Sequence, residues 1–391
     1  MKIVKIEPTP SPNSMKLTLD TRLNPGVRLD VQRGRDDTAP AYIRKLLAIE
    51  GVTGVFQTAD FLALERHPRG DWAAILAAAE AVLGTAAGQG ASSSSGIPGA
   101  PGQQESGYGE LTVRVQTFRG IPMQVRVSTA TSEKRAALPE RFQMAATEAG
   151  LASPNLIMER KLEERGVRYG ELEEVLNQVV SELEAEFGPE RLDELVRQSV
   201  AAGHGYQIPE NAKEPEARQL PAEEAEELER QLDDPDWQVR YAALSRIKAD
   251  SNTLPLLKKA LLDRNISVRR LAVVLAGGVE GEEPLILLIN AMKDSSPVIR
   301  RTAGDSISDR GDPAAVPAME EALTDPSKLV RWRAARFLYE AAGNSSLAAL
   351  EKAKEDTEFE IRLQVRLAIE RITSNTEAQG TVWQQMMRER Q

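Results

Sequence analysis

The chain has 391 residues, of which 41% are hydrophobic and 28% charged, and it contains no cysteine. Without cysteine it cannot form disulfides, use a thiolate nucleophile or hold an iron–sulfur cluster through sulfur. Its length predicts two or three domains, and its net charge of -10 argues against nucleic acid as a general partner.

Residues 1–86 have the pattern of a small α+β domain. The alternating runs KIVKI and MKLTL predict strands over 2–6 and 15–19, and VTGVFQT and FLALER predict two more. PAYIRKLLAIEG and WAAILAAAEAVLG predict helices, and Asp71 is expected to cap the second of them.

The loop between the first two strands, TPSPNS, is rich in proline. Proline fixes φ and forces the preceding residue into an extended conformation, so the loop is expected to be stiff. One interpretation is structural, with Asn13 and Ser14 capping backbone groups where the prolines cannot donate. The other is partner recognition, with Pro12, Asn13, Ser14 and Lys16 as the contact residues.

This order of elements, with TPSPNSMKL and the later pairs GV, VF, DF and DW, resembles the N-terminal domain of Nfu-type iron–sulfur scaffold proteins. The resemblance implies the fold and a docking role on iron–sulfur assembly proteins. The cluster-binding half of that family, with its CxxC motif, is missing here. We therefore expect no cluster, no metal site and no other cofactor on this chain.

A Ser-, Gly- and Pro-rich segment, 87–107, predicts a flexible linker. Residues 108–205 then predict a second small α+β domain. It opens with a β-hairpin that turns at Arg119-Gly120, because apolar and polar residues alternate on both arms. Three helical segments follow, PERFQMAATEAG, GELEEVLNQVVSELEAEFG and PERLDELVRQSVAAG, and 206–219 is expected to be a second linker.

Residues 220–375 contain the pattern D-x-x-x-x-[VI]-R five times. The Val or Ile positions are 29, 31, 31 and 31 residues apart: Val239, Val268, Ile299, Val330 and Ile361. Small or apolar residues stand four and eight positions later, on the same face of a helix. Another helical segment precedes each Asp, so five pairs of helices are predicted to form an α-solenoid, with 376–391 as a tail or cap.

The repeats resemble short HEAT repeats of the phycobilisome-lyase-like kind. The multidomain arrangement as a whole, with an Nfu-like α+β domain, a hairpin-plus-helix α+β domain and a HEAT-like solenoid, resembles the bacterial family called conserved virulence factor C. That family name records a phenotype and names no reaction. It implies a role in regulating virulence-factor expression and transfers no catalytic residue.

The repeated Asp and Arg are expected to form a ladder in which each Asp caps a second helix and each Arg reaches a neighbouring repeat. The ladder arginines are Arg240, Arg269, Arg300, Arg331 and Arg362. The second helices, which the resemblance to HEAT repeats places on the concave face, carry further arginines: Arg270, Arg301, Arg333, Arg336 and Arg366. Such a stripe would attract an acidic peptide, an acidic protein surface or a phosphate backbone. The alternative is that these arginines pair with Glu on adjacent helices.

These observations favour a non-catalytic adaptor or scaffold that binds other proteins, of unknown identity, through its HEAT-like tail. The alternative is an accessory factor in iron–sulfur cluster assembly or delivery, which acts through residues 1–86 without holding a cluster. An enzyme of the lyase-like HEAT kind is the third hypothesis. His67 and His204 are expected in a turn and in a linker.

No apolar stretch reaches the ~20 residues of a membrane span. The start of the chain also lacks the apolar core of a signal peptide. A cytoplasmic protein without a membrane partner is therefore expected.

Overall fold

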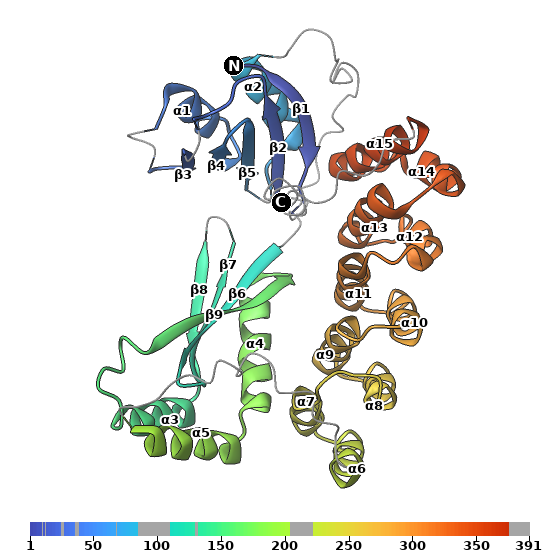
Figure 1. Ribbon diagram of the computed structural model, residues 1–391. Helices are drawn as coiled ribbons and strands as arrows, with labels where there is room; N and C mark the ends of the chain where they lie inside the picture. Colours follow the sequence, from blue (N-terminus) through green and yellow to red (C-terminus); the bar gives the residue numbers. More distant parts are fainter. Residues whose placement is uncertain are drawn as a thin grey trace. The chain divides into compact units, whose positions relative to one another are not determined.

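The computed structural model describes residues 1–84 except 10, 12, 25–26, 36–38 and 68, residues 110–203 except 130–131, and residues 222–374. The chain divides into two compact units. The first combines Met1–Gly109 with Val316–Gln391, and the second is Glu110–Ala315. The predicted fold class is confirmed, since two sheet-containing domains and a series of paired helices are present (Figure 1).

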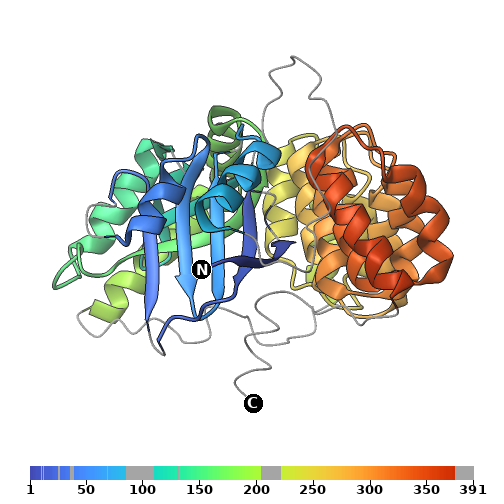
Figure 2. The same ribbon diagram turned by 90° about the horizontal axis from the view of Figure 1, so that it is seen from above.

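The first unit contains a five-stranded antiparallel sheet of order β1-β2-β5-β4-β3. Its strands run side by side in Figure 2, and they are β1 (Ile3–Pro8), β2 (Ser14–Leu19), β3 (Arg28–Gln32), β4 (Val52–Thr58) and β5 (Phe61–Arg66). Two helices, α1 (Ala41–Leu47) and α2 (Trp72–Leu83), bury apolar side chains in the same core as the sheet. Asp71 caps α2 as predicted, because its carboxylate accepts the N–H groups of Ala73 and Ala74.

The second unit opens with a four-stranded antiparallel sheet of order β8-β7-β6-β9. The strands are β6 (Glu110–Phe118), β7 (Ile121–Ser128), β8 (Glu133–Ala137) and β9 (Arg160–Tyr169). The predicted hairpin is confirmed: Arg119 and Gly120 connect β6 to β7 with φ values of 48° and 82°. Two successive residues with positive φ are typical of the type I′ turn, whose twist suits a two-residue hairpin.

Three helices pack against one face of this sheet: α3 (Glu140–Gly150), α4 (Leu172–Glu186) and α5 (Pro189–Ala202). Val113 and Val115 of β6 and Val125 and Val127 of β7 are fully buried in the core that they form. The strands alternate, so the polar residues between these valines lie on the opposite face.

The paired helices continue in the second unit as α6 (Ala222–Gln231), α7 (Trp237–Ser245), α8 (Leu254–Ala260), α9 (Ile266–Gly277), α10 (Glu282–Ala291) and α11 (Pro297–Arg310). In the first unit they are α12 (Val316–Ala322), α13 (Lys328–Ala341), α14 (Leu347–Ala353) and α15 (Phe359–Thr373). Short 3-10 turns, Pro313–Ala315 and Asn344–Ser346, precede α12 and α14. Of the described helices, none is long and apolar enough to cross a bilayer.

Arg240, Arg269 and Arg331 form the predicted ladder within their units, whereas Arg362 donates to the carbonyls of Asp356 and Thr357 in its own repeat. Arg240 donates from Nε to Asp263 at 2.6 Å and from Nη1 to the carbonyl of Asp234 at 2.7 Å. The same pairing recurs as Arg269–Asp294 and Arg331–Asp356. The capping role expected for each Asp is wrong. Asp263, for example, accepts the N–H of Asn265, and Asn265 is the residue that caps α9, because the turn places the Asp two residues too early.

The predicted linkers 87–107 and 206–219, the tail 376–391, Pro12 and His204 all lie outside the described residues. The predicted domain boundaries therefore stay predictions. His67 lies in a turn, as expected, where its Nδ1 accepts the N–H of Arg69 at 3.2 Å.

Candidate interaction surfaces

Arg270 of α9 belongs to a buried polar network in the second unit. Its Nη2 lies 3.9 Å from Oε2 of Glu182 on α4. Glu182 also accepts two hydrogen bonds from Arg168 of β9, at 2.7 and 3.3 Å. On the same face of α4, Gln178 donates to Ser267 of α9 at 3.1 Å. Through these contacts the middle α+β domain is joined to a repeat helix.

The charges in this network strongly affect one another. Burial opposes ionisation of Glu182, but the guanidinium groups of Arg168 and Arg270 outweigh it and hold the pKa of this carboxyl below its ordinary value. Burial, together with the like charge of Arg168, lowers the pKa of Arg270 to about 10. One carboxylate therefore neutralises part of the charge of two buried guanidinium groups, so its removal should be costly.

Glu182→Gln is expected to destabilise the second unit near neutral pH by about 2 kcal/mol, because a neutral amide cannot offset the two guanidinium charges. The pKa of Glu182 is lowered on folding. Its contribution is therefore present above the unfolded carboxyl pKa of about 4.3 and is lost as pH falls through the lower folded value. The difference in melting temperature between the two proteins should shrink as pH falls from about 5 to 3.

The matched control is Glu174→Gln, since Glu174 is exposed on the same helix. This variant is expected to have the same melting temperature as the wild type at every pH. A Glu182→Gln difference that stays constant with pH would mean that the charge of Glu182 does not stabilise the unit.

Arg301 of α11 is the most deeply buried of the second-helix arginines, with 1% of its surface exposed. Its Nη2 donates to Oη of Tyr169 at 2.6 Å and lies 3.1 Å from Oδ1 of Asp305. The guanidinium also lies 4.6 Å from the centroid of the Tyr169 ring, a cation–π geometry. Burial raises the pKa of Tyr169, so its hydroxyl stays neutral and accepts from Arg301.

The remaining second-helix arginines lie in the first unit. Arg336 is buried and its Nη2 lies 2.7 Å from Oε1 of Glu340. Arg333 lies 5.4 Å from the centroid of the Trp332 ring, and Arg366 donates to the carbonyl of Arg362 at 3.4 Å. The pairing alternative, Glu on an adjacent helix, describes Arg270 with Glu182 of α4, whereas the carboxylates beside Arg301 and Arg336 are Asp305 and Glu340, each four residues on in the same helix. Binding of an outside partner by any of the five stays a prediction.

Residues of α15 contact the N-terminal sheet domain inside the first unit. Nη2 of Arg66 lies 2.5 Å from Oε1 of Glu360, and both side chains are buried. The guanidinium of Arg66 also lies 5.1 Å from the centroid of Trp72. Phe359 and Leu363 pack against the apolar core of the same domain. Each α+β domain therefore contacts at least one second helix of its own unit.

The proline-rich loop is held by its own hydroxyl groups. Thr9 is buried and its Oγ1 donates to the carbonyls of Ser11 and Ser14, each at 3.1 Å. The carbonyl of Asn13 accepts the N–H of Arg66 at 2.9 Å. Lys16 follows on β2, where its Nζ lies 3.2 Å from Glu7. Thr9 supplies these side-chain bonds, and Oδ1 of Asn13 has no hydrogen-bond partner among the described residues, so the capping expected of the Asn13 side chain is not found. Partner recognition by Asn13, Ser14 and Lys16 stays a prediction.

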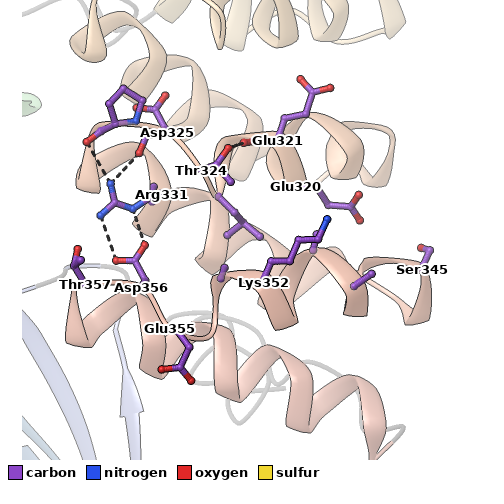
Figure 3. Close-up of a pocket in the computed structure, with 15 residues that line it drawn as sticks. Glu320, Glu321, Thr324, Asp325, Arg331, Ser345, Lys352, Glu355, Asp356 and Thr357 are labelled. Carbon is purple, nitrogen blue, oxygen red and sulfur yellow. Dashed lines mark hydrogen bonds and ion pairs between the residues drawn. The ribbon is translucent and has the colours of Figure 1, made fainter. Parts of the chain in front are cut away.

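An open groove of about 810 Å³ lies between α12 and α14. Figure 3 shows Arg331 inside it, bonded to the carbonyl of Asp325 and to the carboxylate of Asp356. Glu320 and Glu355 also line the groove. Of the carboxyl side chains that line the groove, Asp325 and Asp356 belong to the ladder, and Glu320 and Glu355 add further negative charge to its walls. Within the described ranges, no group of three or more His, Asp or Glu side chains is placed to hold a metal ion.

Sequence reasoning missed the internal partners Glu182, Tyr169 and Glu360. A signal existed for Glu182, because it follows Val175 and Val179 at spacings of seven and three on the apolar face of its helix. A carboxylate on such a face requires a buried cation. Nothing in the spacing of Tyr169 or Glu360 distinguishes them from exposed residues.

Three family models match the three parts of the chain. The model described as scaffold protein Nfu/NifU N terminal matches residues 4–90, virulence factor matches 116–196, and HEAT repeats matches 284–370. The protein named conserved virulence factor C of Staphylococcus saprophyticus is 35% identical over 388 residues, which cover 99% of this chain and 98% of the relative. The chain belongs to the conserved virulence factor C family. The HEAT repeats of this family indicate a role in protein interaction.

Two further relatives are informative about extent. The Bacillus subtilis protein named Uncharacterized protein YpgR is 43% identical over 391 residues, covering 100% of this chain and 99% of the relative. The crystal structure of protein SAV1430 from Staphylococcus aureus is 34% identical, covers 21% of this chain and 98% of that chain, and has a TM-score of 0.20. The full-length relatives therefore share all three parts.

Proposed function

We propose that this member of the family is a non-catalytic cytoplasmic adaptor whose second helices hold its own α+β domains and whose first helices bind a protein partner. The observation that carries the proposal is the burial of Arg270 and Arg301 against Glu182 and Tyr169 inside the second unit. A buried arginine that loses its partner leaves an uncompensated charge, which is costly. Partner binding by these arginines would therefore compete with contacts that stabilise the chain.

The groove between α12 and α14 is the partner site that we propose. Glu320 and Glu355 line it without taking part in the ladder, and Lys352 is exposed at its wall. Asp325 and Asp356 hold Arg331 in place in the groove. A basic or mixed-charge segment of a partner protein suits these walls, because complementary charge favours encounter and sets the register.

Site-specific photo-cross-linking in cells that express the full chain would test this. A photoreactive residue at Lys352 is expected to give adducts with another protein. The same residue at Arg366 on α15, or at Met144, which is 65% exposed on α3, is expected to give none. Adducts at Arg366 in place of Lys352 would contradict the proposal and return the partner to the second-helix arginines.

A second candidate function is assistance in iron–sulfur assembly without a cluster on this chain. It is favoured by the match of residues 4–90 to the Nfu/NifU N-terminal model. In the same experiment, a photoreactive residue at Lys16 separates the two candidates. Adducts between Lys16 and a cluster-carrying protein would favour assembly. No adducts at Lys16, together with adducts at Lys352, would favour the adaptor.

A further inference from the structure

The open face of the middle sheet carries three arginines in one row across neighbouring strands. Arg135 of β8 pairs in register with Arg126 of β7, and Arg126 pairs with Arg114 of β6. Glu164 of β9 continues the row beside Arg114. The valines on either side of Arg114 and Arg126 lie in the core with α3, α4 and α5, so the row is on the face that these helices leave uncovered.

This row is not explained by the fold. Neighbouring strands lie about 4.8 Å apart, and like charges directly opposite each other destabilise a sheet. Among the described carboxylates, Arg114 has a single long contact, to Glu164 at 3.9 Å between exposed side chains, and Arg135 pairs with Glu133 on its own strand. Arg126 donates to the amide oxygen of Gln124 at 3.0 Å. No carboxylate of the described residues contacts the Arg126 guanidinium.

Exposed apolar side chains flank the row on β9. Leu162 is 47% exposed and Val167 is 43% exposed. Their register partners are Gln116 and Thr112, which lie on the open face on the two sides of Arg114. The face therefore presents a line of guanidinium groups next to two apolar side chains, in a chain whose net charge is -10.

We propose that this face binds an acidic amphipathic helix of a partner protein. Carboxylates three and four residues apart on a helix are about 5–6 Å apart, close to the spacing of arginines on adjacent strands. Arginine's planar fork suits carboxylates, and the apolar side of such a helix covers Leu162 and Val167. This surface is distinct from the groove between α12 and α14. The groove is proposed to bind a basic or mixed-charge segment, whereas this face is proposed to bind an acidic one.

Single-stranded nucleic acid fits the face less well. Proteins that bind it on a sheet stack bases on exposed aromatic rings. The aromatic residue at the end of this face, Tyr169, is already engaged by Arg301. The described part of the face offers no other aromatic ring.

The test measures binding of fluorescent probes to the full-length chain by polarisation. The first probe is a short alanine-based helical peptide with Glu on one side and Leu on the neighbouring side. The second replaces each Glu with Lys, and the third is a single-stranded oligothymidine. Only the acidic peptide is expected to bind, more weakly at higher salt, because the charges are exposed.

Arg114→Glu/Arg126→Glu is expected to weaken binding of the acidic peptide about tenfold, from the loss of two exposed charge pairs. Arg114→Gln/Arg126→Gln should weaken binding less. This neutral variant replaces the charge reversal in the test if the reversal impairs folding. The matched control, Arg191→Glu/Arg197→Glu, changes two arginines on α5 that are 42% and 72% exposed, and it should bind as the wild type does. Absence of binding to the wild type, unchanged binding to both row variants, or equal binding of the oligothymidine would overturn the proposal.

Discussion

Arg301→Glu is expected to lower the stability of the second unit by about 5 kcal/mol, the upper range for breaking a buried ion pair. The substitution removes the hydrogen bond to Tyr169 and places a carboxylate beside Asp305, where the distance to the native guanidinium is 3.1 Å. With 1% of Arg301 exposed, water cannot solvate the new charge. For a unit of this size the melting temperature should fall by roughly 10 °C, measured by calorimetry or differential scanning fluorimetry.

The matched reversal is Arg230→Glu on α6, where the side chain is 75% exposed and pairs with Glu227. It should melt within about 2 °C of the wild type, because exposed pairs contribute little. The two variants also separate two roles for Arg301. If Arg301→Glu kept its melting temperature but lost a bound protein, Arg301 would belong to a partner surface and its contacts in the second unit would contribute nothing to stability.

The repeats could be predicted from the sequence because their structure follows from local periodicity. A face of Val or Ile with small residues four positions on fixes which side of each second helix is buried. The Arg–Asp ladder follows in turn, since the same turn geometry recurs and brings Arg269 to Asp294 as it brings Arg240 to Asp263. The position of the cap was wrong, because a spacing of two residues in a turn is not visible in hydrophobic periodicity.

The strands β3, β8 and β9 were not predicted, and all three lie at the edges of their sheets. Edge strands have one unpaired side and tolerate polar and charged side chains, which also discourage aggregation. In β9, RKLEERGVRY, nearly every residue is exposed, so no alternation of apolar residues identified it. Such strands form because they hydrogen-bond to a neighbouring strand, and this pairing leaves no hydrophobic periodicity in the sequence.

The second-helix arginines were found from the sequence, but their surroundings were not. Residue type and spacing identified Arg270 and Arg301 as extra cations on the repeats. Which surface meets them depends on how α4 and β9 fold, since Glu182 and Tyr169 lie more than eighty residues away in sequence. The sequence predicted that the second-helix arginines could attract an acidic protein surface. In the second unit the carboxylate near Arg270 comes from the chain itself, from Glu182 of α4.

Arg119→Asn is expected to destabilise the second unit by about 3–5 kcal/mol, although it changes a residue in a hairpin turn. Asparagine tolerates the positive φ of 48° at this position, so the turn itself should persist. The loss comes from the side chain, which is 1% exposed. Its guanidinium donates to both carboxylate oxygens of Glu159, to Ser199 and to the carbonyl of Gly203. Arg119 thereby joins the hairpin to the end of α5, and thermal unfolding would measure its contribution.

Glu159→Gln and the double variant complete a mutant cycle that isolates the pair from the backbone acceptors. Because Arg119 and Glu159 share two short contacts, 2.6 and 3.2 Å, their coupling should exceed about 1 kcal/mol. The surface control Arg197→Ala on the same helix as Ser199 breaks only an exposed pair with Glu194, so its melting temperature should change by less than about 2 °C. If Arg119→Asn had the same melting temperature as this control, the Arg119 side chain would not stabilise the unit. The link between the hairpin and α5 would then have to come from apolar packing alone.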